Sequence, residues 1–106
     1  MKKIALALTA VLMMVGPVVA ESWDDRCAAD AKLAALIMTQ RQKGIPMSGQ
    51  MKAIGNMPEA SLYRKMVIDA YERPRYRTSE IVQREIEDFR DRWYLGCIKS
   101  DPSRKK

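Results

Sequence analysis

The sequence predicts a small all-α fold: a bundle of three main helices and one short helix, pinned by one disulfide. Apolar residues recur at every third or fourth position through most of the chain, which is helical spacing. Glycine and proline separate the periodic stretches into four segments. The only two cysteines, Cys27 and Cys97, lie near opposite ends of this helical region. No stretch alternates polar and apolar residues long enough to predict a strand.

Residues 1–20 have the pattern of a secretory signal peptide. Two lysines precede an apolar segment over residues 4–15, a Gly-Pro pair follows, and the stretch ends in the small residue Ala20. We therefore expect cleavage before Glu21 and a periplasmic or secreted protein. A retained anchor is the alternative, but the segment is shorter than the about 20 residues that span a bilayer. A lipid anchor is not expected, since Cys27 does not directly follow the apolar segment.

The helical domain is expected over residues 21–99 and opens with a long helix over residues 23–43. Ser22 precedes this helix as an N-cap, and Lys43-Gly44 is a typical stop signal. The residues predicted to be buried follow helical spacing: Trp23, Cys27, Ala31, Ala34, Ile37 and Met38.

Two shorter helices follow. Ser48 is expected to cap a short helix over residues 49–54, which Gly55 ends. The next helix is expected over residues 58–72, because its first residue is a proline, which suits a first helical turn, and Pro74 prevents continuation. Its apolar residues again repeat at three and four: Leu62, Tyr63, Met66, Val67, Ala70 and Tyr71.

The fourth helix has the clearest pattern, and Thr78 or Ser79 is expected to cap it. One narrow stripe of this helix is apolar: Val82, Ile86, Phe89, Trp93 and Cys97. The opposite face alternates in charge at every fourth position, which is typical of a solvated surface: Glu80, Arg84, Asp88 and Arg92.

Cys27 and Cys97 are expected to form a disulfide. Export would place them in an oxidising compartment, and two cysteines allow a single intramolecular pairing. Closing a loop of about 70 residues contributes about 4 kcal/mol in the chain-entropy model. The pairing joins the start of the first helix to the end of the fourth, so these two helices should run antiparallel. A reactive cysteine is the alternative, but the chain has no histidine to serve as its base.

Positive charge is concentrated at the C-terminus. The formal net charge is +6, of which two charges belong to Lys2 and Lys3 in the leader, and most of the remaining excess lies in residues 99–106. We expect residues 100–106 to form a disordered basic tail that makes at most weak contact with anionic surfaces. The nearly neutral domain and the exported location argue against nucleic acid as a partner, and no stable membrane anchor is expected after cleavage.

Residues spread over the helical domain resemble those of a known group: Cys27, Arg41-Gln42, Gly44, Ala70-Tyr71, Pro74-Arg75-Tyr76, Phe89, Trp93-Tyr94 and Cys97. The chain is similar to the small exported helical proteins of proteobacteria and their phages. That group has no established activity. The resemblance therefore implies no catalytic, metal-binding or ligand-binding residues.

The strongest candidate for recognition is the connection between the third and fourth helices. It concentrates arginine, which presents a planar fork to carboxylate or phosphate, and tyrosine, which adds rigid contact area. The candidate partner-binding residues are Tyr71, Arg73, Arg75, Tyr76 and Arg77. In the alternative, structural interpretation, the tyrosines pack inward and the arginines pair with Glu72 and Glu80 around a turn at Pro74.

Two acid pairs lie on the fourth helix: Glu85 with Asp88, and Glu87 with Asp91. Paired acids that flank a bond are the machinery of glycosidases and muramidases. These acids share one helix with arginines, so a solvated face explains them and no catalytic residue is expected.

Methionines and aromatic residues also have structural interpretations. Three methionines offer soft ligands to Cu(I), but core filling is the simpler role for Met47, Met51 and Met57. We therefore expect no metal and no cofactor. Aromatic residues are expected to cluster beside the disulfide, where a groove for peptide or glycan is an open alternative: Trp23, Trp93 and Tyr94.

These observations predict an exported, non-enzymatic binding protein. Its expected partner is another envelope or exported protein, engaged through residues 71–77, as by an inhibitor, immunity factor or phage exclusion factor. The first alternative is a periplasmic stress chaperone whose Met-rich segment, residues 47–66, opens at acidic pH, although the chain lacks histidine as a trigger. The second alternative is a cell-wall hydrolase that uses Glu85 or Asp88.

Overall fold

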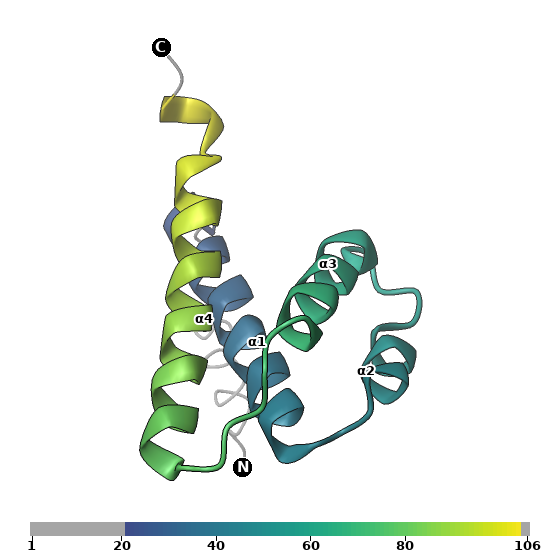
Figure 1. Ribbon diagram of the computed structural model, residues 1–106. Coiled ribbons are helices and arrows are strands. Elements are labelled where there is room, and N and C mark those ends of the chain that lie inside the picture. Colours follow the sequence, from purple (N-terminus) through teal and green to yellow (C-terminus); the bar gives the residue numbers. More distant parts are fainter. Residues whose placement is uncertain (1–20, 105–106) are drawn as a thin grey trace, which may run out of the picture.

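The computed structural model describes residues 21–104, and this part of the chain is all-α (Figure 1). The helices are α1 Trp23–Lys43, α2 Met47–Ile54, α3 Ala60–Tyr71 and α4 Ser79–Lys99, followed by the 3-10 turn η2 Pro102–Arg104. Three main helices and one short helix are thus confirmed, and residues 21–104 contain no strand. The expected signal peptide, residues 1–20, and the last two residues of the expected tail lie outside the described residues.

α1 and α4 lie side by side and run antiparallel (Figure 1). A disulfide between Cys27 and Cys97 joins the first turns of α1 to the last turn of α4, with the two Cα atoms 5.5 Å apart. Both the predicted pairing and the predicted helix direction are confirmed. Ala31 and Ala34 of α1 are buried, and their small size lets a neighbouring helix approach closely.

α3 packs across α1, and α2 packs against α3, so these two helices lie on one side of the α1–α4 pair (Figure 1). The core forms where the three main helices meet. Its largest fully buried side chains include Met38 of α1, Met66 and Val67 of α3, and Phe89 of α4. Burying a side chain of this kind contributes roughly 2 kcal/mol to stability.

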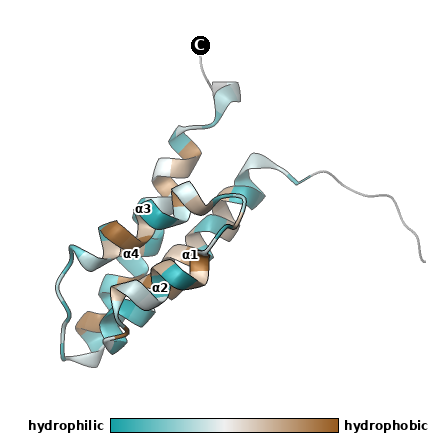
Figure 2. Ribbon diagram, turned by 90° about the vertical axis from the view of Figure 1, so that its right-hand side faces the viewer, coloured by the Kyte–Doolittle hydropathy of each residue, from teal (hydrophilic) through white to brown (hydrophobic). Residues whose placement is uncertain are grey.

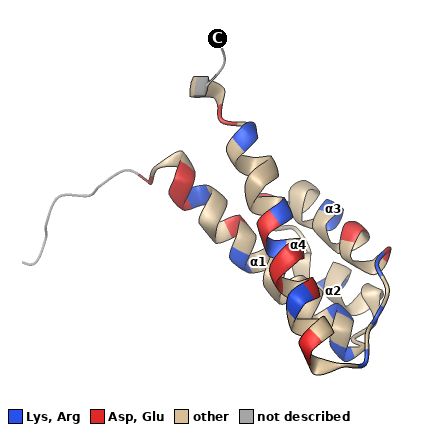
Figure 3. Cartoon of the chain, turned by 60° about the vertical axis from the view of Figure 1, so that its left-hand side comes forward, with Lys and Arg blue, Asp and Glu red and all other residues tan. Residues whose placement is uncertain are grey.

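α4 has the two faces that its sequence predicts. Phe89 is buried, and the rest of the apolar stripe is half-buried: Val82, Ile86, Trp93 and Cys97. All four residues of the charged face are exposed: Glu80, Arg84, Asp88 and Arg92. Figure 2 shows polar and apolar residues in succession along the helices, and Figure 3 shows the acidic and basic residues of α4.

The first two helix starts differ in how they are capped. The predicted Ser22 cap of α1 is confirmed, since its hydroxyl accepts a hydrogen bond from the Asp25 amide at 3.0 Å. The predicted Ser48 cap is wrong, because α2 begins at Met47 and Ser48 lies inside its first turn. Pro46 holds the N-cap position instead, and its carbonyl accepts a hydrogen bond from the Gly49 amide at 3.0 Å.

α3 is shorter than expected at both ends. The predicted start at residue 58 is wrong, because the Ala60 amide bonds to the Met57 carbonyl at 2.9 Å and so closes a tight turn before the helix. Glu59, with φ −106° and ψ 30°, stands between this turn and the helix. At the other end Tyr71 is the last helical residue. Thr78 holds the N-cap position of α4, but its side chain makes no capping hydrogen bond.

Candidate functional site

The arginine loop, residues 71–77, lies where α1 ends and α4 begins. Figure 1 shows the connection from α3 running past the end of α1 to the start of α4. We call this end of the helix pair the closed end. Tyr71 is half-buried there: its hydroxyl donates to the Ile45 carbonyl at 2.6 Å and accepts from Gln50 Nε2 at 2.9 Å. The Arg41 guanidinium carbon lies 5.0 Å from the centroid of the Tyr71 ring.

The last turn of α1 binds the backbone of the arginine loop. Gln42 is only 6% exposed; its Nε2 donates to the Pro74 carbonyl at 2.9 Å, and its Oε1 accepts from the Tyr76 amide at 2.8 Å. Arg41 donates from two nitrogens to the Arg73 carbonyl, at 2.8 and 3.0 Å. These hydrogen bonds are partly buried, and groups withdrawn from water in this way are normally paired. Local sequence patterns do not predict this role for Gln42, because its partners lie more than thirty residues away.

Two of the three loop arginines are turned toward the protein. Arg73 pairs with Asp69 at 3.1 Å and with Glu85 at 4.0 Å, and its guanidinium carbon lies 5.3 Å from the centroid of the Phe89 ring. Arg75 Nε donates to the Gln42 carbonyl at 3.2 Å.

Gly44 makes room for the Arg75 side chain. A Cβ atom at Gly44 would lie 3.1 Å from the Arg75 guanidinium, and its φ of 89° also requires glycine. Neither Arg73 nor Arg75 pairs with Glu72 or Glu80 in the described residues. Of the five predicted binding residues, Arg75, Tyr76 and Arg77 are exposed. Arg75 is held to α1 by its hydrogen bond, so Tyr76 and Arg77 are the exposed ones with no side-chain hydrogen bond or ion pair in the described residues.

A pocket of about 400 Å³ opens at the other end of the helix pair. We call it the disulfide pocket. It lies between the start of α1, the first half of α3 and the end of α4, and its lining residues are Trp23, Arg26, Asp30, Leu62, Met66, Trp93, Gly96, Cys97 and Ser100. The structure thus brings both tryptophans of the chain to one cavity beside the disulfide. Tyr94, the third residue of the expected aromatic cluster, does not line this cavity.

Internal hydrogen bonds fix both tryptophan rings of the pocket. Trp23 Nε1 donates to the Cys97 carbonyl at 2.9 Å, and Trp93 Nε1 donates to Asp69 Oδ2 at 2.9 Å. Trp93 also packs against Phe89, with ring centroids 6.3 Å apart. Because both indole N–H groups are satisfied internally, the rings offer the pocket apolar surface and no donor.

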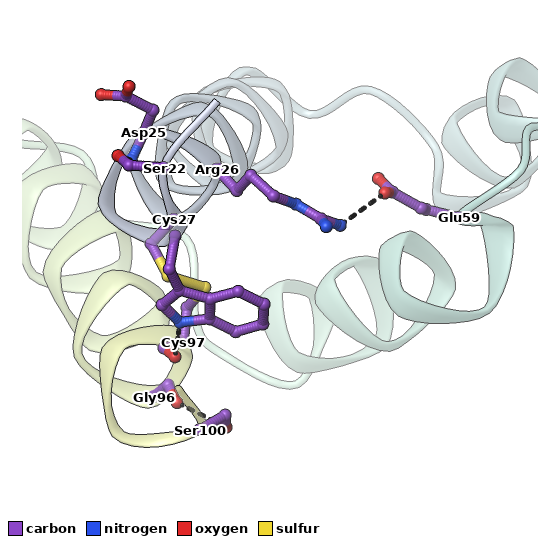
Figure 4. The surroundings of a disulfide bond; sticks show 9 residues. Ser22, Asp25, Arg26, Cys27, Glu59, Gly96, Cys97 and Ser100 are labelled. Atoms are coloured by element: carbon purple, nitrogen blue, oxygen red, sulfur yellow. Dashed lines mark hydrogen bonds and ion pairs between the residues drawn. A yellow bond between two sulfur atoms is a disulfide. The ribbon is translucent and has the colours of Figure 1, made fainter. Parts of the chain in front are cut away.

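The rim of the pocket carries charge. Arg26 points toward Glu59 and pairs with it at 3.3 Å (Figure 4), while its guanidinium carbon lies 5.5 Å from the centroid of the Trp23 ring. The other carboxylate oxygen of Glu59 accepts from the Tyr63 hydroxyl at 2.6 Å. This hydrogen bond is the main cause that raises the pKa of Tyr63 to about 12.

Asp30 is the one acidic residue of the pocket lining. Its carboxylate forms no hydrogen bond or ion pair in the described part of the chain. Burial raises the pKa of Asp30, the nearby charge of Glu59 raises it further, and Arg26 opposes both effects. Sequence inspection did not single out Asp30, Arg26, Leu62 or Met66 as site residues, because only the packing of three helices brings them together.

The acid pairs of α4 face different surroundings. Glu85 approaches Arg73, whereas Asp88 is exposed on the charged face. Glu87 accepts from Gln83 at 3.1 Å, and Asp91 pairs with Arg90 at 3.0 Å. None of these four acids lines the disulfide pocket.

The three methionines of the middle segment are spread over differing environments. Met47 and Met57 are exposed, while Met51 is half-buried and packs against the core. In residues 21–104 no group of three histidine, cysteine or acidic residues is arranged to hold a metal ion.

Comparison with known proteins assigns no function to this arrangement. No protein-family model, curated protein or solved structure matches the chain. Among the described helices, none is long and apolar enough to span a membrane. The similarity to exported proteins and the exported location therefore stay predictions.

Proposed function

We propose that this protein is an exported, non-enzymatic binding protein that engages another envelope or exported protein at the disulfide pocket. The observation that carries the proposal is the open cavity of about 400 Å³ with both tryptophans in its wall. Roles as an inhibitor, immunity factor or phage exclusion factor are forms of this binding function.

The pocket has the properties of an anchor site. Protein interfaces gain most of their binding energy from a few side chains that fill pockets and exclude water. Leu62 and the two indole rings supply apolar walls, and Arg26 and Asp30 supply polarity at the edge. The disulfide and the indole hydrogen bonds hold the walls in place before a partner arrives, which lowers the entropic cost of binding.

The arginine loop remains a second candidate contact surface, with fewer side chains available than the sequence suggested. Tyr76 is 36% exposed and Arg77 is exposed, so these two side chains can reach a partner. Arg73 and Arg75 already bind the protein itself. We therefore propose that they position the loop.

A stress chaperone is the alternative function, and one observation favours it. Met47 and Met57 are 36% and 45% exposed, so the middle segment already presents apolar surface. A chaperone of this kind would bind a hydrophobic dye increasingly as the pH falls. A cell-wall hydrolase is a weaker alternative, and a lack of activity on purified peptidoglycan would remove it.

Gly96 offers a direct way to test the pocket. An added Cβ at this position in α4 meets no atom within 4 Å, so Gly96→Leu should place a side chain in the cavity without a clash. Leucine is also a better helix former than glycine by roughly 1 kcal/mol, so the fold should not weaken. Gly49→Leu on α2 is the matched control, since its Cβ meets only Ile45 Cγ2 at an ordinary 3.9 Å.

The experiment is capture of partners from envelope extract by the oxidised protein. We expect one stoichiometric partner that the wild type and Gly49→Leu retain and Gly96→Leu loses. Retention by Gly96→Leu together with loss by Arg77→Glu would contradict the pocket as the site and favour the arginine loop. Capture of many unrelated proteins, increasing at low pH, would favour the chaperone.

A further inference from the structure

We propose that the disulfide pocket accepts an alkylammonium group, as at the end of a lysine side chain of the partner, with the Asp30 carboxylate as its counter-charge. This inference rests on the proposed function and specifies the chemistry of its anchor residue. Three properties of the pocket support it: the balance of charge, the surroundings of Asp30 and the apolar walls.

One carboxylate that lines the pocket, that of Asp30, has no ion-pair partner in the described residues. Arg26 and Asp30 are the two charged residues of the lining. Arg26 is matched by Glu59 at 3.3 Å, and its guanidinium also lies against the Trp23 ring. Asp30 has no such partner among residues 21–104. A ligand that brings one positive charge would balance the site.

The surroundings of Asp30 make a cation favourable. Its carboxylate is half-buried, and the groups that act on it electrostatically are Glu59, Glu21 and Arg26. Two of these three are acidic. Burial and Glu59 raise the pKa of Asp30 above its ordinary value of 3.8, which means that the ionised form lacks compensation in the free protein. An ammonium group bound beside it would supply that compensation.

The walls of the pocket fit the rest of a lysine side chain. Leu62 is half-buried and offers apolar contact to a chain of methylene groups, with the buried Met66 behind it. Trp93 adds an aromatic ring with no cation against it in the described residues, and such a ring attracts a cation. A small inorganic cation would use neither feature, so the pocket favours a cation with an apolar stem.

Fluorescence provides a direct readout, because both tryptophans of the chain line the pocket. The probe is n-hexylammonium, and 1-hexanol is its neutral counterpart of equal chain length. We expect the wild type to bind n-hexylammonium about fivefold more tightly than 1-hexanol. Asp30→Asn should remove this preference and leave binding of 1-hexanol unchanged. The control Asp88→Asn, on the exposed face of α4, should keep the preference.

Equal binding of the two probes, or a preference that survives Asp30→Asn, would overturn the inference. Partner capture with Gly96→Leu separates this failure from failure of the proposed function. If the probes bind equally while Gly96→Leu abolishes capture, the pocket is the recognition site and its anchor is not cationic. If Gly96→Leu still captures the partner, the proposed function is wrong. This inference is then also wrong, because it rests on that function.

Discussion

The two ends of the α1–α4 pair are held together in different ways. At the closed end, Gln42 and Arg41 hydrogen bond to the backbone of the arginine loop. At the opposite end, which we call the pocket end, the disulfide Cys27–Cys97 joins the helices and a cavity of about 400 Å³ opens beside it. At the closed end, polar side chains that could bind a partner form hydrogen bonds within the protein. At the pocket end, a cavity remains open to a ligand.

The difference follows from the nature of the two connections. Backbone groups of a partly buried loop must each find a hydrogen-bond partner at about 3 Å, so the side chains around them are drawn in. A disulfide fixes two Cα atoms, here 5.5 Å apart, and places no such demand on its surroundings. Side chains such as Leu62 and Trp93 can therefore border open space.

Removal of the disulfide should have the largest effect. The double variant Cys27→Ala and Cys97→Ala is expected to lose about 4 kcal/mol of unfolding free energy, since the closed loop spans 70 residues. Denaturant unfolding measures this loss, and reduction of the wild type should reproduce most of it. A loss below about 1 kcal/mol would mean that the pocket end is held by its other contacts.

Gln42→Ala should be the most damaging single change at the closed end. It leaves the Pro74 carbonyl and the Tyr76 amide without their partners, which should cost about 2 kcal/mol. The control Gln83→Ala removes one exposed hydrogen bond to Glu87 and should change stability by less than about 0.5 kcal/mol. Equal effects in denaturant unfolding would refute the role of Gln42 as the link between α1 and the loop.

Arg73 and Arg77 should differ although they lie in one loop. Arg73→Ala removes the pair with Asp69 and the contact with Phe89, and we expect a loss of about 1 kcal/mol. The gain from Arg73 is limited because its Nε is buried without a hydrogen-bond partner in the described residues. Arg77→Ala should be neutral within about 0.5 kcal/mol. Thermal unfolding that ranks Arg77 above Arg73 would reverse our assignment.

The smallest expected effect is a pH dependence at the rim of the pocket end. The pKa of Tyr63 is raised from 10.0 to about 12 in the fold, so folding favours the protonated phenol. Its contribution is fully present below pH 10 and is lost as the pH rises toward 12. Tyr63→Phe should lack this part of the alkaline decline in unfolding free energy. If Tyr63→Phe shows the same alkaline decline in unfolding free energy as the wild type, groups other than Tyr63 cause that decline.

Much of the fold could be predicted from local patterns. The helical spacing of α1 and α4 depends on residues that are close in sequence. The pairing of Cys27 with Cys97 follows because the chain has no other cysteine. The starts of α2 and α3 could not be predicted as well. There Pro46 and Met57 accept bonds from amides three residues on, and sequence preferences do not distinguish these tight turns from helix.

The candidate site was harder to predict, because it depends on how three helices meet. Asp30 looks like an ordinary polar residue of an amphipathic helix until α3 and α4 are placed around it. The arginine loop was overestimated as a binding surface. Its composition does not show that Gln42 forms hydrogen bonds with its backbone. Both cases require contacts between residues more than thirty positions apart, such as Gln42 with Tyr76 at a separation of 34.

The most direct test of recognition at the pocket end is an amide chemical-shift map of the isotope-labelled, oxidised protein titrated with n-hexylammonium and with 1-hexanol. We predict that the largest shifts for both probes fall on Trp23, Asp30 and Gly96, and that Gly96→Leu abolishes them. Residues Tyr76 and Arg77 should stay unshifted. Largest shifts in the arginine loop, with the pocket residues unmoved, would contradict the account.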